Sequence, residues 1–209
     1  MGAAVVFAGP RRVRHASVAL SERLPFPSGA LGDTLPPVAV TPQKVDLSEL
    51  RNVGLFGALS DEALEHLAST LSVVQPSAGD VLFSEGDVAG DMFVVLEGEI
   101  EVLKRSRQGS DSRVAVLGSG DWFGEMSIVD VQPRSATVRA IAPSRLLRIT
   151  AKDLDALYRY DIKAYSLIVL NLARELSRRL RVADSILADF IANVVDSYMG
   201  SGRSSRPRR

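Results

Sequence analysis

The stretch FGEMSIVDVQPRSATV, residues 123–138, places a glycine, a carboxylate and a guanidinium within a short span of chain. Arg134 follows a proline, and its side chain can direct two N–H donors at the oxygens of a phosphate group. The carboxylate of Glu125 only accepts hydrogen bonds, so it suits a hydroxyl group and not an anion. Gly124 lets a ligand approach the backbone closely. Together these residues predict a site for an anion that also carries hydroxyl groups.

The residues after Gly124 are expected to form one short helix, because EMSIV is long enough for little more than one turn. The first N–H groups of a helix have no partner inside the helix, and they are a common way to hold a phosphate. We therefore expect these backbone groups and Arg134 to bind the same anion.

The segments around this stretch predict which elements hold it. Residues 73–149 consist of short alternating apolar runs separated by glycines, a pattern typical of a small antiparallel sandwich or barrel. Residues 44–72 are expected to be helical, with Ser60 as an N-cap. After Thr150 the period becomes helical again, with a short helix to about Tyr160 and a second helix over 161–199 that Gly200 ends.

Composition divides the chain into four segments. Residues 1–43 are rich in proline and are expected to be a disordered arm, 44–160 to be the folded domain, 161–199 to be one long helix, and 200–209 to be a disordered basic tail. The arm and the tail hold eight of the 25 basic residues and two of the 25 acidic ones, so the stretch between them carries 17 basic and 23 acidic residues. Such an acidic body argues against broad binding to nucleic acid.

The long helix predicts self-association. Its apolar residues recur at spacings of three or four, as in a coiled coil, and a helix of this length extends past a small domain. We therefore expect a homodimer through 161–199; the alternative is that the helix lies back on its own domain. The seam consists of Val169, Leu172, Leu176, Leu180, Ala183, Leu187, Phe190 and Val194.

Several classes of protein are excluded by what the chain lacks. It has no cysteine, no apolar run of the roughly 20 residues that span a bilayer, and only two histidines, His15 and His66. A metal enzyme needs clustered histidine and carboxylate ligands, so we expect neither a metal nor an enzyme. The N-terminus has its charge after its apolar run, unlike a secretory signal, and a cytoplasmic protein away from the membrane is the default.

The opening stretch resembles the phosphate-binding cassette of the cyclic nucleotide-binding domain family. Phe123 to Ile128 fill the first six places of that cassette and Arg134 to Val138 fill its last five. The preceding GDVLFSEGD, 79–87, and DMFVVLEGEIEV, 91–102, resemble the second and third strands of the family. The resemblance implies an α+β fold, in which an antiparallel β-roll or jelly-roll is flanked by N-terminal helices and a long C-terminal helix.

The resemblance also implies roles for individual residues. Glu125 would accept a hydrogen bond from the ribose 2′-hydroxyl, and Arg134 would bind the cyclic phosphate. The backbone N–H groups of Gly124, Met126 and Ser127 would supplement Arg134, and Ser135 would add backbone or hydroxyl contacts. The sugar and base would be lined by Val114, Val116 and Phe123, while the side chains of Met126 and Ile128 would belong to the core.

The helix 161–199 resembles the lid and dimer helix of the bacterial cyclic-AMP receptor relatives, most closely over LSRRLRVADSI at 176–186. The positions expected to contact the base hold Ala183 and Asp184, where the cyclic-AMP-specific activators have small hydroxyl residues. Asp184 and Ser135 favour cyclic GMP, because a carboxylate and a hydroxyl suit guanine. Asp184 as a solvated helix residue is the alternative, so the choice between cAMP and cGMP stays open.

These features lead to the hypothesis of a sensor that binds a cyclic nucleotide and signals through its C-terminal helix to an unknown downstream protein. Transcription activators of the family carry a helix-turn-helix domain after the lid helix, whereas only residues 200–209 follow it here, so we expect no specific DNA binding. One alternative is a kinase inhibitor that acts through the basic segment RRVRHASVAL at 11–20, as in kinase regulatory subunits. Another is a constitutive dimeric scaffold without a ligand.

Overall fold

A computed structural model describes residues 40–41, 45–88, 90–106, 109–130 and 132–201. The predicted arm over 1–43, with its kinase-like segment 11–20, and the basic tail over 200–209 therefore lie almost wholly outside the described residues. Within the arm, Val40–Thr41 is described, and it forms strand β1 along β2. This short strand differs from the expectation of disorder, because pairing at a sheet edge satisfies its backbone hydrogen-bonding groups.

The segment predicted to be helical before the sheets contains α1 (Leu47–Arg51), the 3-10 helix η1 (Gly54–Phe56) and α2 (Asp61–Thr70). Ser60 is the N-cap of α2, as the sequence predicts, and its Oγ accepts a hydrogen bond from the Ala63 N–H at 3.3 Å. Leu50 of α1 and Leu64 and Leu67 of α2 are buried, so each of these helices has one apolar side that is covered.

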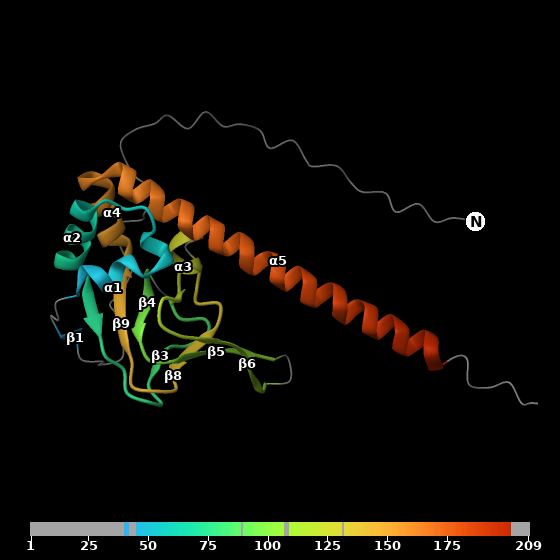
Figure 1. Ribbon diagram of the computed structural model, residues 1–209. Helices are drawn as coiled ribbons and strands as arrows, with labels where there is room; N and C mark the ends of the chain where they lie inside the picture. Colours follow the sequence, from blue (N-terminus) through green and yellow to red (C-terminus); the bar gives the residue numbers. More distant parts are fainter. Residues whose placement is uncertain (1–39, 42–44, 89, 107–108, 131, 202–209) are drawn as a thin grey trace, which may run out of the picture. The chain divides into compact units, whose positions relative to one another are not determined.

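The strands form two antiparallel sheets, which confirms the α+β class and the antiparallel architecture. The first sheet has the order β1-β2-β9-β4-β7 and the second has the order β3-β8-β5-β6. Their bounds are β2 Ser72–Val74, β3 Val81–Phe83, β4 Asp91–Glu97, β5 Ile100–Arg105, β6 Asp111–Leu117, β7 Trp122–Phe123, β8 Thr137–Ala140 and β9 Arg145–Thr150. A four-residue helix, α3 (Met126–Val129), lies in the connection from β7 to β8 (Figure 1).

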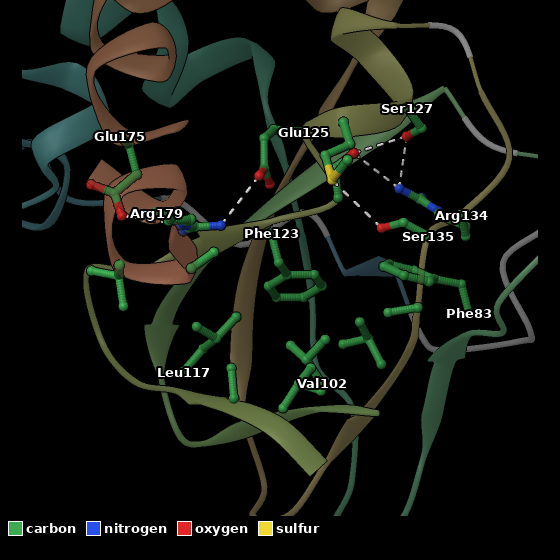
Figure 2. A pocket seen from close by; sticks show the side chains of 18 of the residues that line it. Phe83, Val102, Leu117, Phe123, Glu125, Ser127, Arg134, Ser135, Glu175 and Arg179 are labelled. Atoms are coloured by element: carbon green, nitrogen blue, oxygen red, sulfur yellow. Dashed lines mark hydrogen bonds and ion pairs between the residues drawn. The ribbon is translucent and has the colours of Figure 1, made fainter. Parts of the chain in front are cut away.

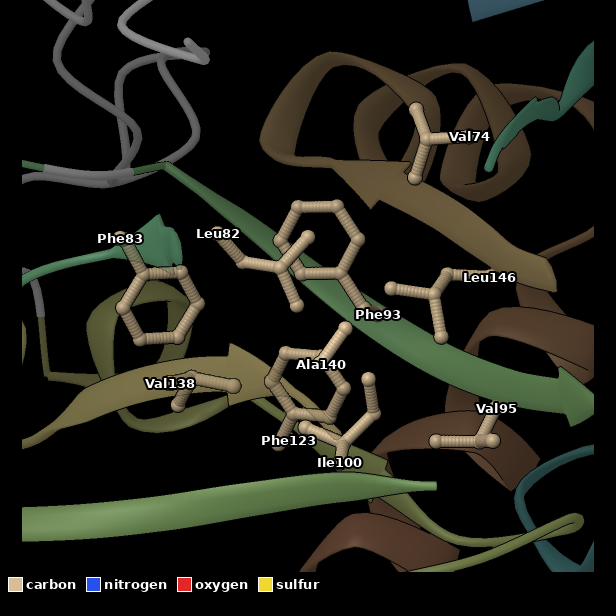
Figure 3. Close-up of a cluster of buried hydrophobic side chains, with 10 residues drawn as sticks. All are labelled: Val74, Leu82, Phe83, Phe93, Val95, Ile100, Phe123, Val138, Ala140 and Leu146. Carbon is tan, nitrogen blue, oxygen red and sulfur yellow. The ribbon is translucent and has the colours of Figure 1, made fainter. Parts of the chain in front are cut away.

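The core is formed by buried side chains from both sheets (Figure 3). Phe93 on β4 stacks on Phe123 of β7 with ring centroids 5.4 Å apart, and on Phe83 of β3 with centroids 6.3 Å apart. Aromatic rings packed at these distances contribute both buried area and specific geometry. Because β3 and β7 lie next to the predicted cassette, the core fixes the elements that carry it.

Two helices follow the sheets, α4 (Ala151–Tyr160) and α5 (Ile162–Ser201). Thr150 caps α4 as predicted, and the Asp161 carboxylate accepts the N–H groups of Lys163 and Ala164 at the start of α5. Helix α5 continues to Ser201, so Gly200 lies inside its last turn and does not end it. Its 40 residues correspond to a length of about 60 Å. No helix in the described part of the chain is both long and apolar enough to cross a membrane.

The first part of α5 is anchored to the domain. Ala164, Ile168 and Leu172 recur every four residues and are buried. Asn171, on the same part of the helix, donates hydrogen bonds to the backbone carbonyls of Leu55 and Gly57 at 3.0 and 3.1 Å. Residues 180–196 are all exposed. Helix α5 therefore has a docked part and an uncovered part.

The first prediction concerns this anchor. Asn171→Ala removes the donor from two carbonyl groups beside η1, and we expect it to lower the free energy of unfolding by about 1–3 kcal/mol. Urea unfolding followed by fluorescence of the single tryptophan measures this change. The matched control is Asn193→Ala on the exposed part of α5, which should stay within about 0.5 kcal/mol of wild type. Equal losses in the two variants would contradict an anchoring role for Asn171.

Candidate functional site

A cavity of about 480 Å³ lies between the sheets, α3 and α5 (Figure 2). This volume falls in the usual range for small-molecule sites. Most of the residues that the sequence singled out line it: Val114, Phe123, Gly124, Glu125, Met126, Ser127, Arg134, Ser135 and Ala183. Val116 and Asp184 do not line it.

Arg134 is a buried charge in the wall of the cavity, at 5% exposure. Its Nη1 donates hydrogen bonds to the carbonyl of Asp91 at 2.7 Å, the Oγ of Ser127 at 3.0 Å and the carbonyl of Gly124 at 3.2 Å. The guanidinium lies over the ring of Phe83, 3.8 Å from its centroid. Its Nε–H has no hydrogen-bond partner among the described residues. A buried, unpaired N–H is costly, and here it marks a donor available to a ligand.

The charge of Arg134 is balanced by Asp91, a buried residue at the start of β4. The Asp91 carboxylate pairs with Nη2 of Arg134 and, through its other oxygen, with Nε of Arg148 on β9 at 2.6 Å. Burial lowers the pKa of Arg134, while the nearby Asp91 carboxylate raises it. Arginine stays protonated in proteins, so Arg134 remains a cation in the site.

The sequence analysis did not identify Asp91 as a site residue, although Asp91 begins the stretch 91–102 that carried part of the resemblance.

Gly124 occupies a position that only glycine fills without strain. Its φ of 83° is in the left-handed region, and a Cβ there would lie 2.7 Å from Nη1 of Arg134 and 3.2 Å from the carbonyl oxygen of Asp91. Any side chain would therefore push the guanidinium out of its place.

Glu125 precedes α3 and is 4% exposed. Its Oε1 pairs with Nη1 of Arg179 on α5 at 3.2 Å, as Figure 2 shows. Burial raises the pKa of Glu125, and the attraction of Arg179 opposes that rise. Arg179 also donates to the carbonyl of Trp122 at 2.9 Å and to Glu175 at 3.1 Å. Arg179 therefore joins α5 to the cassette, a role that its place in LSRRLRV alone did not indicate.

The two serines and Met126 complete the polar side of the cavity. Ser127 Oγ donates to the Gly124 carbonyl at 2.8 Å, and the Ser135 carbonyl accepts a hydrogen bond from Lys104. The Ser135 hydroxyl donates to the sulfur of Met126 at 3.6 Å. Met126 is 53% exposed and lines the cavity, so the expectation that it packs in the core is wrong, whereas Ile128 is buried.

The opposite side of the cavity is apolar, and its strand β6 presents different residues from those expected. Val102 pairs with Ala115 and Leu103 with Arg113, which leaves Val114 as the extra residue of a β-bulge. A bulge re-aims the side chains around it, and Val114, Ala115 and Leu117 line the cavity. Val116, which the sequence assigned to this pocket, points elsewhere and is half exposed.

Helix α5 closes the cavity with side chains on one helical face: Glu175, Arg178, Arg179, Val182, Ala183 and Ile186. Asp184 is exposed and lies outside this set. Successive helical residues are about 100° apart, so Asp184 falls off the face that Val182 and Ile186 share. Among the described residues no group of three or more histidine, cysteine or acidic side chains is placed to hold a metal ion.

Comparison with known proteins identifies the domain. The sequence model of the cyclic nucleotide-binding domain matches residues 73–161. The CRP-like cAMP-activated global transcriptional regulator of Mycobacterium tuberculosis is 31% identical over 142 residues, which cover 68% of this chain and 62% of the regulator. The cAMP-dependent protein kinase regulatory subunit of Mycosarcoma maydis is 34% identical over 91 residues, 44% of this chain and 17% of that protein. The chain thus spans less than two thirds of these curated relatives.

Solved structures support the same fold assignment. The N-terminal domain of a transcriptional regulator from Streptomyces coelicolor A3(2) aligns with a TM-score of 0.57 and 32% identity, over 64% of this chain and 93% of that one. A cyclic nucleotide-binding domain from Methylobacillus flagellatus aligns with a TM-score of 0.62 and 28% identity, over 68% of this chain and 81% of that one. The span 73–161 that the family model matches contains strands β3 to β9 and the whole of the cavity's cassette. Residues 73–161 of the chain form a domain of the cyclic nucleotide-binding domain family.

Proposed function

We propose that this protein is a sensor that binds a cyclic nucleotide in the cavity between the sheets and α5. The observation that carries the proposal is the buried guanidinium of Arg134, whose Nε–H is unpartnered in a cavity that it shares with a buried carboxylate, Glu125. A cyclic phosphate supplies the acceptor that this N–H lacks. The ribose of the same molecule supplies a hydroxyl for the carboxylate.

The two sides of the cavity suit the two ends of such a ligand. Gly124, Ser127 and Arg134 form the phosphate end, with Ser135 at its edge, and Glu125 stands beside it for the sugar. The apolar side from β5 and β6, with Phe123, provides a surface on which a flat base can be buried. In this assignment Met126 contributes its backbone N–H and its exposed side chain borders the ligand.

For the base, we propose cAMP as the first ligand to test, with cGMP as the alternative. The regulators from Mycobacterium tuberculosis and Mycosarcoma maydis are named for cAMP. The argument for guanine depended on Asp184, whose side chain is not part of the cavity wall. The α5 residue at the adjacent position, Ala183, offers a methyl group and no hydrogen bond.

Helix α5 is the proposed route of the signal. Its Arg179 binds Glu125, the group assigned to the ribose, so a ligand that engages Glu125 changes what holds α5. The exposed half of α5 would pass this change to a second copy of the chain and to a downstream protein. A ligand shifts such an equilibrium only by its difference in affinity for the two states. The kinase-inhibitor alternative depends on residues 11–20, which are outside the described residues.

The second prediction tests the phosphate site. Arg134→Lys keeps the positive charge beside Asp91 but removes the planar fork and the Nε–H, and we expect at least about a 100-fold loss of cyclic nucleotide affinity. Calorimetry with cAMP and with cGMP measures it. The control is Arg159→Lys, an exposed arginine on α4 that pairs with its helix neighbour Asp155. Failure of the wild type to bind either nucleotide would refute the proposal.

The third prediction concerns Glu125 and pH. Because burial raises its pKa in the folded protein, the folded state holds this proton to higher pH than the unfolded chain does. Its contribution to stability is complete below the ordinary value of 4.5 and is lost as pH rises through the raised pKa. The free energy of unfolding of wild type minus that of Glu125→Gln should therefore fall as pH rises from acid to neutral.

Glu49 is the control of opposite sign. Its hydrogen bond with Arg145 lowers its pKa below 4.5, so its contribution is present above that value and is lost as pH falls through the lowered pKa. The difference between wild type and Glu49→Gln should rise with pH. Urea unfolding across a pH series measures both, and a difference for Glu125→Gln that stays flat or rises would show that Arg179 outweighs burial.

The fourth prediction tests self-association. Leu187 is 56% exposed on the apolar seam of α5. Leu187→Glu places a charge in that seam, and we expect it to convert the dimer to a monomer at micromolar concentration in light scattering. Leu170→Glu, an exposed leucine of the same helix outside the seam, is the matched control and should remain dimeric. If wild type itself is monomeric, the dimer is excluded; if nucleotide never changes its association, it behaves as a constitutive scaffold.

A further inference from the structure

The turn at 84–87, which follows β3, holds the backbone of Arg134 from outside the cavity. The N–H of Gly86 donates to the carbonyl of Arg134 at 2.9 Å, and the N–H of Arg134 donates to the carbonyl of Asp87 at 2.8 Å. Asp87 also closes the turn, because its carboxylate accepts the N–H of Ser84 at 2.8 Å. None of the four residues of this turn lines the cavity. The backbone of Arg134 is therefore held by a segment that a ligand in the cavity does not touch.

Glu85 connects the same turn to β5 and to the residues after Arg134. Its Oε1 accepts a hydrogen bond from Nζ of Lys104 at 2.7 Å, and its Oε2 accepts the N–H of Arg105 at 3.1 Å. Lys104 in turn donates to the carbonyl of Ser135. Lys104 follows the last β5 residue that pairs with β8, so its side chain reaches a part of the cassette that precedes β8. Glu85 and Lys104 thus connect three segments that are far apart in the chain.

These contacts fix the orientation of two successive peptide groups. The carbonyl oxygen of Arg134 is held by Gly86, and the carbonyl oxygen of Ser135 is held by Lys104. In a planar trans peptide group the N–H points away from the C=O. The N–H groups of Ser135 and Ala136 therefore point away from Gly86 and Lys104. Both Ser135 and Ala136 line the cavity, whereas Gly86 and Lys104 do not.

The two N–H groups have the properties of an anion site. Neither has a hydrogen-bond acceptor among the residues that the structure describes. The chain bends at Ser135 and Ala136 before β8 begins, and successive N–H groups at a bend form a common anion-binding arrangement. The Nε–H of the adjacent Arg134 also lacks a partner in the described chain. One phosphate group has enough oxygen lone pairs to accept from all three donors.

We propose that Glu85 and Lys104 are positioning residues for the phosphate end of the cavity. Lys104 holds the Ser135 carbonyl so that the N–H groups of Ser135 and Ala136 are presented to the anion, and Glu85 holds Lys104. The inference rests on the proposed function for the identity of the anion. It adds the Ala136 N–H to the donors, and it gives a role in binding to two charged residues that lie outside the cavity.

The pair has the character of a surface ion pair in every other respect. The side chains of Lys104 and Glu85 are 49% and 32% exposed, and pairs of this kind contribute little to stability. The pKa of Glu85 lies below its ordinary value of 4.5, first because Lys104 donates to the carboxylate and also because the Arg105 N–H does. The pair is therefore charged at neutral pH. A positioning role predicts a loss of ligand affinity without a matching loss of stability.

Lys104→Met in the full chain keeps most of the side-chain length but removes the charge and the donors. We expect it to weaken cAMP binding by about tenfold in calorimetry, because two N–H groups lose their alignment with a charged acceptor. Lys104→Arg restores a charged donor and should stay within about threefold of wild type. The control Arg105→Met removes a charge from the next residue, whose side chain is 71% exposed and pairs with Asp111, and it should bind like wild type. Urea midpoints of all these variants should stay within about 0.3 M of wild type.

A double-mutant cycle tests the role of Glu85. Glu85→Gln keeps the shape of the side chain and weakens its bond to Lys104, so we expect a smaller loss of cAMP affinity, about threefold. The double variant Glu85→Gln/Lys104→Met should lose no more than Lys104→Met alone, because Glu85 acts through Lys104. Losses that simply add would show two independent effects and would overturn the positioning role of Glu85.

The two phosphorothioate diastereomers of cAMP show whether Lys104 acts on the phosphate. In each of them sulfur, a weak acceptor, replaces one exocyclic oxygen. For the diastereomer whose sulfur faces the N–H groups of Ser135 and Ala136, Lys104→Met should cost less affinity than it does for cAMP. A purely structural effect of the substitution would cost the same for all three ligands, and that result would overturn the proposal.

Inorganic phosphate, used as a probe in amide NMR, separates this inference from the proposed function. Phosphate should shift the amide resonances of Ser135 and Ala136 in wild type and not in Lys104→Met. Equal cAMP affinity of wild type and Lys104→Met would overturn the inference and leave the proposed function standing. If wild type binds neither cAMP nor cGMP, the proposed function is refuted and the phosphate shifts alone decide the positioning role. Shifts that are absent from wild type, or equal in the two proteins, would then overturn it.

Discussion

The need to neutralise a buried guanidinium governs the centre of this domain. Arg134 sits over Phe83 with almost no exposure, and moving a charge out of water is expensive unless a counter-charge and hydrogen bonds replace the water. Asp91 supplies the counter-charge, and Arg148 balances the second oxygen of that carboxylate. Asp91 begins β4, and Arg148 is on β9, the strand that pairs with β4. The position of Arg134 is therefore fixed by two neighbouring strands of the first sheet. The glycine at 124 and the aromatic core are arranged around that fixed point.

Helix α5 shows how one amphipathic element serves several surfaces. Near its start, residues such as Ile168 and Leu172 are buried against the domain, and Asn171 binds the backbone of η1. One turn later the same side of the helix closes the cavity through charged side chains. Farther on, the apolar residues are exposed among the residues that the structure describes. A helix stabilised by packing only along its first part stays helical beyond it when its residues, rich in leucine, alanine and arginine, favour that state.

Local sequence carried much of the fold and part of the site. The caps at Ser60 and Thr150, the change from alternating to helical period and the order of the cassette are all properties of neighbouring residues, and sequence patterns predict these well. What escaped prediction depends on pairing in three dimensions. The bulge at Val114 exists only relative to its partner strand, and it decides that Leu117 and not Val116 faces the cavity. The bonds of Asp91 and Arg179 likewise join segments far apart in the chain.

The continuity of α5 has a mechanical consequence. Between Leu172, the last of its buried leucines, and Val195 the helix is uninterrupted, a reach of about 35 Å, and its residues from Leu180 onward are exposed. A rigid rod pivoting at its anchored end acts as a lever, so a tilt of about 5° where Arg179 meets the cassette displaces the far end by about 3 Å. A sub-ångström adjustment at the cavity would thereby become a movement as large as a side-chain contact at the far end of the helix.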